Sequence, residues 1–375
     1  MQGRIAYSSG VPSPGGRLLL DHLFKFGVQS QAALPRLLGL SQPTVARLLR
    51  GFAQSDLLRL ASRAPEGPGN PSVDVRLNPN HAFAFGVSMM GDAFAIALLD
   101  LSGAVRGQRR QAMAQMDRVQ VLAQLREFAD ELLAEAGVTP TRVLGVGVGI
   151  SAFFSGQGAE MVGPPALEDW TGMELVPLFE QALGVPAIVE NDGAVAAVAE
   201  SLYGIGRDCA DFVYLHLTNG FGGGIISNGR LLRGHRGNAG EFGGIWTVSG
   251  LEYPNLDSLL RYVQAAEGKM ETVEQLLPNL TIATPGVEAW LAMAQEPFAR
   301  LCSILSYGLD PQMVIIGGRL PAPLTEALVA RLHVPRAPNR HGLSPPLPEL
   351  RVAGVRGDAV MLGAGLLPLQ RAFFV

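Results

Sequence analysis

Apolar residues recur at helical spacing in three segments near the start of the chain, and glycine or serine separates these segments. Residues 16–27 form the first segment and end on a glycine, which is a typical stop signal for a helix. Residues 30–38 predict a short second helix that begins at a Ser30 cap. After a short turn with a glycine, residues 42–55 predict a third helix capped by Ser41. Two helices joined by such a turn are the helix-turn-helix pattern.

The third predicted helix has an apolar stripe and a polar face. We expect the stripe to pack inward, and it consists of Val45, Leu48, Leu49 and Phe52. On the polar face, four side chains near the start of the helix can read base edges in a major groove: Ser41, Gln42, Thr44 and Arg47. Arg50 lies farther along and is expected to contact a DNA phosphate. The alternative interpretation is a small structural domain whose polar face is simply solvated.

A hairpin is predicted after the third helix. Residues 57–60 predict a strand, residues 63–71 are rich in Gly and Pro and predict a turn, and residues 72–77 predict a returning strand. A hairpin in this position is the wing of a winged helix-turn-helix domain. Residues 1–80 carry nine Lys or Arg and four Asp or Glu, a net charge of +5, whereas the remainder carries −9. The charge therefore favours a polyanionic partner for this part of the chain only.

From residue 82 onward the pattern changes to strands that enter glycine turns and lead into helices. Strands are predicted at 82–88, 93–103, 143–150, 186–189, 211–217, 223–227 and 313–316. Helices are predicted at 116–136, 175–183 and 193–203, and over much of 256–308. This alternation predicts an α/β fold.

Composition indicates a globular protein in a reducing compartment. The chain has 375 residues, enough for two or three domains, with 48% apolar and 17% charged residues. Its two cysteines have no short spacing, so we expect no disulfide framework. The sequence starts without the basic and apolar segments of a signal peptide, and it has no run of 18 apolar residues. We therefore expect a cytoplasmic protein with no membrane partner.

Seven short motifs follow one another in the second part of the chain. They are Gly86-Val87 with residues 99–103, residues 164–170, Glu190-Asn191-Asp192, and residues 220–225, 237–243, 310–318 and 357–365. In these motifs the chain resembles the ROK family of repressors and sugar kinases, within the actin-like ATPase superfamily, and the likeness covers nearly the whole chain. The resemblance implies a winged helix-turn-helix domain at 1–80, followed by a two-lobed actin-like fold. The first lobe is expected at 81–195 and the second at 196–375, with the C-terminal helix as a candidate to return to the first.

The resemblance assigns sugar chemistry to one group of polar residues. In the family an Asn-Asp pair binds the sugar, and its Asp takes the proton from the attacking hydroxyl; Asn191 and Asp192 match this pair. Glu241, preceded by Gly240, matches a carboxylate that binds sugar hydroxyls. Carboxylates and amides suit sugars because they satisfy several hydroxyl groups at once. The alternative is an Asx turn at Asn191-Asp192 that caps the following helix, and the two roles can coexist.

The phosphate-binding loops of the family are altered. The first loop, Asp-x-Gly-Gly-Thr in the family, aligns with Ser88-Met89-Met90-Gly91-Asp92. The acid has become Ser88, and the carboxylate of Asp92 stands where phosphate oxygens would approach and be repelled. The second loop keeps Gly220 and Gly222 but has Thr218-Asn219 where the family has Gly-Thr, so we favour a tight turn between strands. Gly317-Gly318 matches the adenosine motif, although helix–strand packing alone can also explain these glycines.

The zinc site of the family is also missing. Gly244 stands in place of its histidine, and residues 245–260 contain no cysteine, whereas a structural zinc needs about four nitrogen or sulfur ligands. We therefore expect no metal and no cofactor. Either Glu252 or Asp257 can replace the acidic residue that ends the zinc segment in the family. Two tryptophans are candidates either for shaping the pocket or for the core: Trp170 and Trp246.

These observations predict a sequence-specific transcription regulator, a repressor of carbohydrate metabolism whose degenerate kinase cleft senses a sugar or sugar derivative. Its expected partners are double-stranded operator DNA, the sugar effector and further copies of the chain, as a homodimer or dimer of dimers. We expect no catalysis. The alternative is an ATP-dependent sugar kinase with a regulatory head, in which Asp192 is the base; a further alternative is a DNA-binding scaffold that senses nothing.

The predicted wing departs from the family in one respect. Its turn reads Gly69-Asn70-Pro71, whereas the family often presents Gly-Arg-Pro. The arginine that would enter a minor groove is therefore absent, and Arg63 and Arg76 are the candidates to reach the DNA backbone.

Overall fold

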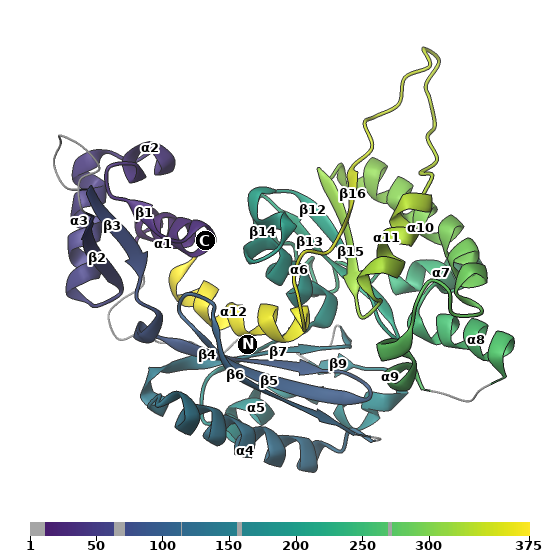
Figure 1. Ribbon diagram of the computed structural model, residues 1–375, viewed down its shortest axis with the longest axis horizontal. Helices are drawn as coiled ribbons and strands as arrows, with labels where there is room; N and C mark the ends of the chain where they lie inside the picture. Colours follow the sequence, from purple (N-terminus) through teal and green to yellow (C-terminus); the bar gives the residue numbers. More distant parts are fainter. Residues whose placement is uncertain (1–11, 64–71, 114, 156–159, 269–271) are drawn as a thin grey trace.

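The computed structural model describes residues 12–63, 72–113, 115–155, 160–268 and 272–375. Figure 1 shows a small N-terminal unit, which we call the head, beside a larger body with two main β-sheets. The predicted turn of the wing, with Gly69-Asn70-Pro71, lies outside the described residues, as does the side chain of Arg63. In the part of the chain that the structure describes, no helix has the length and apolarity that a membrane crossing requires.

The head combines three helices with a three-stranded antiparallel sheet, which is the arrangement of a winged helix. Its elements are α1 (Pro14–Phe26), β1 (Gln29–Ser30), α2 (Leu34–Leu38), α3 (Gln42–Gln54), β2 (Leu58–Arg63) and β3 (Ser72–Leu77). Ser41 begins α3 as predicted, because its hydroxyl accepts a hydrogen bond from the N–H of Thr44 at 3.3 Å. Val45 and Leu49 of α3 are buried in the same cluster as Leu19 of α1. The amphipathic pattern thus positions α3 with its polar face outward.

The predicted second helix was wrong in its first half. Ser30 lies in β1, where it pairs with Asp74 of β3, and it does not cap a helix. A turn follows, and α2 begins only at Leu34, with Pro35 in its first turn. Pairing with β3 therefore overrides the helical spacing of residues 30–33. Proline has no N–H to donate, so it suits the true start of the helix.

The first sheet of the body has the strand order β11-β7-β4-β5-β6. Its strands are β4 (Phe83–Met89), β5 (Ala93–Asp100), β6 (Val105–Ala112), β7 (Val143–Ile150) and β11 (Ala187–Asn191). Helices α4 (Arg118–Ala136) and α5 (Leu175–Leu183) cover one face of this sheet, below it in Figure 1. Strand β6 was not predicted, because its sequence is polar; it is an edge strand with exposed charged side chains, which protect such an edge from further pairing.

Short elements make the connections. A small sheet with the order β10-β9-β8 consists of β8 (Phe153–Phe154), β9 (Glu160–Val162) and β10 (Met173–Glu174). The 3-10 helices are η1 (Pro79–His81), η2 (Pro140–Arg142), η3 (Pro165–Trp170), η4 (Ile205–Asp208) and η5 (Leu277–Asn279). Of these, η1 joins the last strand of the head to the first strand of the body.

The second sheet has the strand order β14-β13-β12-β15-β16. Its strands are β12 (Phe212–Leu217), β13 (Phe221–Ser227), β14 (Arg230–Leu231), β15 (Met313–Gly318) and β16 (Glu349–Val352). The helices beside it are α7 (Gly243–Ser249), α8 (Leu256–Glu267), α9 (Val273–Leu276), α10 (Val287–Leu309) and α11 (Ala322–Arg331). Helices α8, α10 and α11 bury one face of this sheet in a common apolar core.

Two helices lie side by side between the sheets: α6 (Asp192–Leu202) and α12 (Ala359–Phe373). Helix α12 packs on β4 and β7 of the first sheet, whereas α6 packs on β12 and β13 of the second. Their contact requires glycine, since a Cβ atom on Gly363 would lie 1.8 Å from the carbonyl oxygen of Val195. The predicted boundary between the lobes, at 195/196, falls inside α6, and the domain boundaries stay a prediction.

Candidate functional site

A cleft of about 880 Å³ opens between the two sheets. The ends of β4, β7 and β11 contribute one wall, and the β12–β13 turn, α9 and the residues after β15 contribute the other. The first residues of α6 and α12 form its floor. The residues that sequence predicted for the sugar site or the phosphate loops and that line the cleft are Ser88, Asp92, Asn191, Asp192, Asn219, Gly220, Gly222 and Glu241.

Asn191 has two structural roles at the start of α6. Its side-chain oxygen accepts a hydrogen bond from the N–H of Ala194 at 3.1 Å and so caps the helix. Its amide nitrogen donates to the carbonyl oxygen of Ala152 at 3.1 Å and to the carboxylate of Glu241 at 2.9 Å. The cap therefore holds the amide at the cleft wall, where it joins the first sheet to the loop that carries Glu241.

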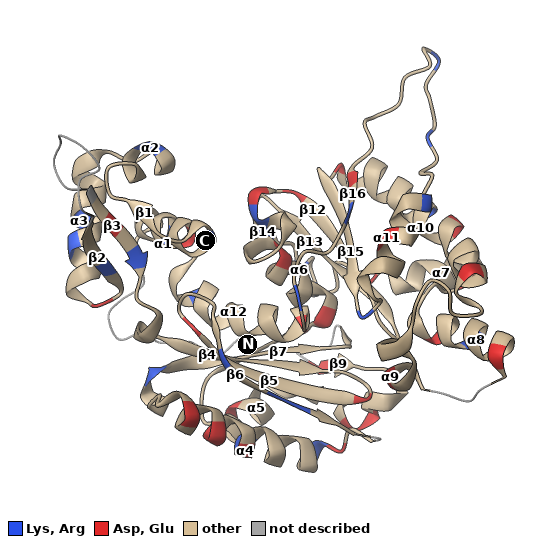
Figure 2. Cartoon of the chain, in the orientation of Figure 1, with Lys and Arg blue, Asp and Glu red and all other residues tan. Residues whose placement is uncertain are grey.

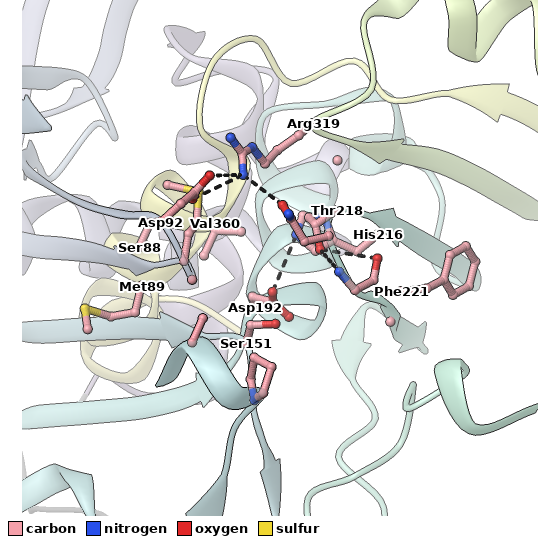
Figure 3. A pocket seen from close by; sticks show the side chains of 18 of the residues that line it. Ser88, Met89, Asp92, Ser151, Asp192, His216, Thr218, Phe221, Arg319 and Val360 are labelled. Atoms are coloured by element: carbon pink, nitrogen blue, oxygen red, sulfur yellow. Dashed lines mark hydrogen bonds and ion pairs between the residues drawn. The ribbon is translucent and has the colours of Figure 1, made fainter. Parts of the chain in front are cut away.

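Asp192 lies in the first turn of α6, beside a histidine that the sequence patterns did not single out. One oxygen of Asp192 accepts the N–H of Gly193 at 2.7 Å, and the other lies 3.9 Å from Nε2 of His216 (Figure 3). Burial lowers the pKa of His216, although the charge of Asp192 opposes this effect, so we assign a neutral imidazole at neutral pH. His216 lies within the apolar strand β12, and the sequence patterns therefore did not single it out. The signal that could have identified it is a histidine in an otherwise apolar strand.

Glu241 is the titratable group most clearly tuned by the cleft. Burial of its carboxyl, followed by the negative charge of Asp192, raises its pKa to about 7. At neutral pH this carboxyl can therefore both donate and accept hydrogen bonds. Gly240 does not line the cleft; its φ is 105°, and a Cβ atom there would lie 2.3 Å from the carbonyl oxygen of Gly223. Gly240 therefore allows its own backbone to pass close to the backbone of Gly223, and it does not contact a ligand in the cleft directly.

On the opposite side of the cleft, an arginine fills the region expected for phosphate. Arg319 directly follows Gly317-Gly318, and its guanidinium donates to the Asp92 carboxylate at 3.1 and 3.3 Å (Figure 3). The same side chain donates to the side-chain oxygen of Asn219 at 3.1 Å and pairs with Glu274 of α9. We call these four residues the Arg319 network. It spans the cleft, because Asp92 lies in the turn between β4 and β5 of the first sheet, whereas Arg319, Asn219 and Glu274 lie on the side of the second sheet.

Sequence reasoning placed Asp92 and Asn219 in this region but missed Arg319 and Glu274. Arg319 follows a glycine motif that drew attention only to the glycines. Glu274 reaches the cleft from α9, which the sequence patterns did not resolve as a separate helix. Arg110 of β6 also pairs with Glu274, at 3.0 Å. The pairing of distant segments, rather than any local pattern, creates this network.

The second phosphate loop forms a tight hairpin turn. The hydroxyl of Thr218 accepts a hydrogen bond from the N–H of Gly220 at 3.2 Å, and β13 begins at Phe221. Gly222 is opposite His216 in the antiparallel ladder with β12. The backbone amides after the turn thus lie within a paired strand, and no residue of this turn has a positive φ.

The cleft lining carries buried polar atoms without hydrogen-bond partners. Within the described ranges, Oγ of Ser88, Nδ1 of His216 and one carboxylate oxygen of Asp358 are buried and unpartnered. All three residues line the cleft. Buried polar atoms without partners are costly, so a ligand with hydroxyl groups would be stabilised here.

The segment after Glu241 is the one in which the resemblance would have implied zinc ligands. Among the residues that the structure describes, no group of three or more His, Cys, Asp or Glu side chains can hold a metal ion. Asp257 lines the cleft and accepts a hydrogen bond from Asn219 at 2.9 Å, whereas Glu252 bonds to Tyr262 away from it. Trp170 and Trp246 are each 1% exposed and belong to apolar cores.

The predicted DNA-contacting residues share one outer face of the head. Ser41, Gln42, Arg47 and Arg50 are exposed, and Thr44 is half-buried. The hydroxyls of Ser41 and Thr44 lie 2.8 Å apart at the helix start. Figure 2 shows Lys and Arg on α3, β2 and β3, where few acidic residues interrupt them.

Comparison with known proteins gives relatives along nearly the whole chain. The sequence is 26% identical to the uncharacterized protein y4fQ of Sinorhizobium fredii, over 96% of this chain and 91% of that protein. It is 22% identical to a xylose repressor of Bacillus spizizenii, over 64% of this chain, and spans 62% of that repressor. It is 30% identical to a β-glucoside kinase of Listeria innocua, over 56% of this chain and 74% of the kinase.

Solved structures and the family profile agree on the fold. A ROK family transcriptional regulator, a homolog of the E. coli MLC protein, superposes with a TM-score of 0.65 at 20% identity, covering 96% of this chain and 95% of that one. The ROK family profile matches residues 84–252, which include the Asn191-Asp192 pair and Glu241. The matched residues lie in the two-lobed body, whose fold is that of ROK proteins, and the chain belongs to the ROK family.

Proposed function

We propose that the protein is a DNA-binding transcription regulator, a repressor of carbohydrate metabolism, and that a sugar or sugar derivative bound in the cleft controls it. One observation carries this proposal. The sugar side of the cleft keeps Asn191, Asp192 and Glu241, while the Arg319 network occupies the phosphate side. A site arranged in this way favours a bound sugar over phosphoryl transfer.

The charge of the cleft supports a sensor more than a kinase. Its described lining has six carboxylates, on Asp92, Asp192, Glu241, Asp257, Glu274 and Asp358, against two arginines, Arg110 and Arg319. Both arginines are already paired with these carboxylates. A nucleoside triphosphate, which is negatively charged, would therefore enter a negatively charged site in which both described arginines are already paired.

The head is linked to the cleft by the two central helices, which supports control of DNA binding by a ligand. Helices α6 and α12 begin at the cleft floor and end beside α1 of the head. Phe24 of α1 packs against Tyr203 after α6 and against Phe374 after α12, with ring centroids 5.7 and 4.7 Å apart. A change in cleft opening can thus move the head, provided that the ligand prefers one of the two states.

Relatives support both halves of the proposal without deciding between its alternatives. One relative is named a xylose repressor and another a β-glucoside kinase, each at low identity. The fold neighbour is described as a transcriptional regulator. We propose that this chain acts as a repressor and not as a kinase. It would bind double-stranded operator DNA as a homodimer or dimer of dimers.

The test is operator affinity in the presence of sugars. Operators are selected from random duplexes, and affinity is measured with a panel of unphosphorylated and phosphorylated sugars. We expect at least one sugar to change affinity by about fivefold or more, and Glu241→Gln to weaken that response. Glu252→Gln, outside the cleft, is the matched control and should respond as the unmodified protein does. If no sugar or sugar phosphate alters affinity, the sensor proposal fails.

DNA recognition has its own test on α3. Arg47→Ala should weaken binding to the selected operator by about 1–3 kcal/mol if Arg47 reads a base edge. Binding to random duplex should then change much less. An equal loss on both duplexes would instead make Arg47 a phosphate contact.

The second candidate function is an ATP-dependent sugar kinase. Asp192 beside the neutral His216 favours it, because this carboxylate is free to accept a proton from a sugar hydroxyl. This function predicts ATP consumption with Mg²⁺ and a hexose, lost in Asp192→Asn. Absence of turnover across common hexoses and amino sugars would exclude it.

A further inference from the structure

A second, smaller cavity lies where the head joins the first sheet of the body. Its volume is about 240 Å³, and its lining comes from β2, β3, η1 and β6: Arg59, Arg76, Pro79, Asn80 and Arg106. We call it the arginine pocket. It shares no residue with the cleft, and the proposed function assigns it no role.

Two of its arginines are placed at a cost in stability. Arg59 of β2 and Arg76 of β3 are directly opposite in the antiparallel ladder, and both are exposed. Their side chains leave the face of the hairpin opposite to Val75 and Leu77, which are buried. Like charges directly opposite on neighbouring strands are destabilising. An anion between them would remove this repulsion.

The carboxylates nearby leave the pocket with a positive excess. Arg106 pairs with Asp100 at 3.3 Å, but Asp100 is buried and already accepts from the N–H and hydroxyl of Ser102. Asp56 accepts a hydrogen bond from Asn78 at 2.9 Å, and Asp74 lies two residues from Arg76 on the same face of β3.

The guanidinium groups around the pocket differ in how many of their N–H donors already have a partner. Arg59 donates to the side-chain oxygen of Asn78 at 3.0 Å, and Arg106 also donates to Asn80. Over the described ranges, Arg76 forms no hydrogen bond or ion pair, although Asp74 is close in the sequence. Arg142, beside the pocket, donates to the carbonyl oxygen of Asn80. At least one guanidinium therefore keeps all its donors for a ligand.

We propose that the arginine pocket binds a phosphate group. Planar guanidiniums offer paired N–H donors that match phosphate oxygens, and several of them meet here from two directions. The cavity is smaller than the roughly 300–1,000 Å³ of sites for drug-sized ligands, so it suits the phosphate group itself rather than a whole nucleotide. The phosphate belongs either to the DNA backbone or to a small phosphorylated metabolite.

A bound phosphate would tie the head to the body. Arg59 and Arg76 belong to the head, Arg106 belongs to β6, and η1 between them is the connection of the two units. Anything that binds only one relative placement of these parts stabilises that placement. The pocket thus gives phosphate a means to fix the orientation of the DNA-binding face.

The first arm of the test uses inorganic phosphate and the full-length protein. We expect ³¹P NMR titration to show saturable binding, weakened about tenfold or more in Arg76→Ala. Arg126→Ala is the matched control, because Arg126 is an exposed arginine on α4 whose described partners are its helix neighbour Asp130 and the carbonyl of Ala182. In chloride buffer, Arg76→Ala should unfold at the same urea concentration as the unmodified protein or higher, because a repulsion is lost.

The second arm uses random-sequence duplex DNA at several salt concentrations. If the phosphate is that of the DNA backbone, Arg76→Ala should lower the slope of log affinity against log salt by about 1, while Arg126→Ala leaves it unchanged. Saturable phosphate binding with an unchanged slope assigns the pocket to a small phosphorylated ligand. Failure of both the titration and the slope change overturns the proposal. The first arm does not depend on DNA binding, so its result stands apart from the proposed function.

Discussion

Glu241 sets the charge of the sugar side, because its carboxyl and that of Asp192 face the same cleft. Its pKa of about 7 lies above the ordinary value of 4.5. The folded protein therefore favours the protonated form, and this contribution to stability is present below about pH 4.5 and lost as pH rises to 7. Glutamine at this position stays neutral over the whole range.

The pH dependence of stability should therefore change in Glu241→Gln. Relative to this variant, the unmodified protein should lose about 1 kcal/mol in free energy of unfolding between pH 4.5 and 7, since water in the cleft screens much of the charge. Urea denaturation at a series of pH values measures this difference, with Glu252→Gln as the control. A difference between the two proteins that stays constant over that range would contradict the assignment.

Arg319 is the second residue whose role can be measured alone. Its side chain is 16% exposed, and it neutralises carboxylates from both sides of the cleft. Arg319→Ala should lower the free energy of unfolding by about 1–3 kcal/mol, between the effects of exposed and of fully buried ion pairs. Arg331→Ala removes a more exposed arginine that pairs with Glu288 on the same lobe, and it should cost less than about 1 kcal/mol. Equal losses in the two variants would show that Arg319 does not hold the cleft walls together.

At the scale of elements, the sequence predicted those whose boundaries depend on local chemistry. Ser41 begins α3 and Gly137 ends α4, because a hydroxyl cap and a left-handed glycine act within one turn. Long-range pairing explains the misses: β6 exists because it pairs with β5, and β1 because it pairs with β3. The same distinction holds for the site. A local motif predicted Asn191 and Asp192, whereas the role of Arg319 depends on partners far away in the sequence and was missed.

The contact of α6 with α12 leads to a prediction at this scale. Gly363→Ala would bring a Cβ atom within 1.8 Å of a backbone carbonyl of α6, and backbone cannot give way cheaply. We expect a loss of about 2 kcal/mol or more in the free energy of unfolding. Gly308→Ala, in α10 with open space around the new atom, should instead stabilise by about 0.5–1 kcal/mol. Chemical denaturation distinguishes them, and similar behaviour of the two variants would mean that the helices separate easily.

For the whole molecule, the question is how the state of the cleft reaches the head. Arg17 of α1 donates to the last carbonyls of α12, at 2.6 Å to Phe374, 2.9 Å to Arg371 and 3.3 Å to Gln370. Cations at the C-terminus of a helix are stabilised by its dipole and by carbonyls that lack helical partners. The guanidinium of Arg207, after α6, lies over the ring of Phe26, with 5.5 Å to its centroid. The C-terminal end of α12 and the segment after α6 therefore both contact α1 of the head.

Arg17 is the contact whose removal should separate sensing from response. If the proposed coupling is correct, Arg17→Ala should leave sugar affinity within about twofold, because Arg17 does not line the cleft. The change of operator affinity on adding that sugar should fall toward no change, since α12 would no longer carry its movement to α1. Calorimetry with the sugar and anisotropy with the operator measure the two effects separately. Lys25→Ala on the same helix is the control, because among the described residues the Lys25 ammonium pairs with Asp21 of the head, and the substitution keeps the Lys25 carbonyl that accepts from Arg207. If Arg17→Ala retains the full response, the hydrogen bonds of Arg17 do not carry the signal, and the contacts of Tyr203 and Arg207, which follow α6, with Phe24 and Phe26 of α1 are the next candidates.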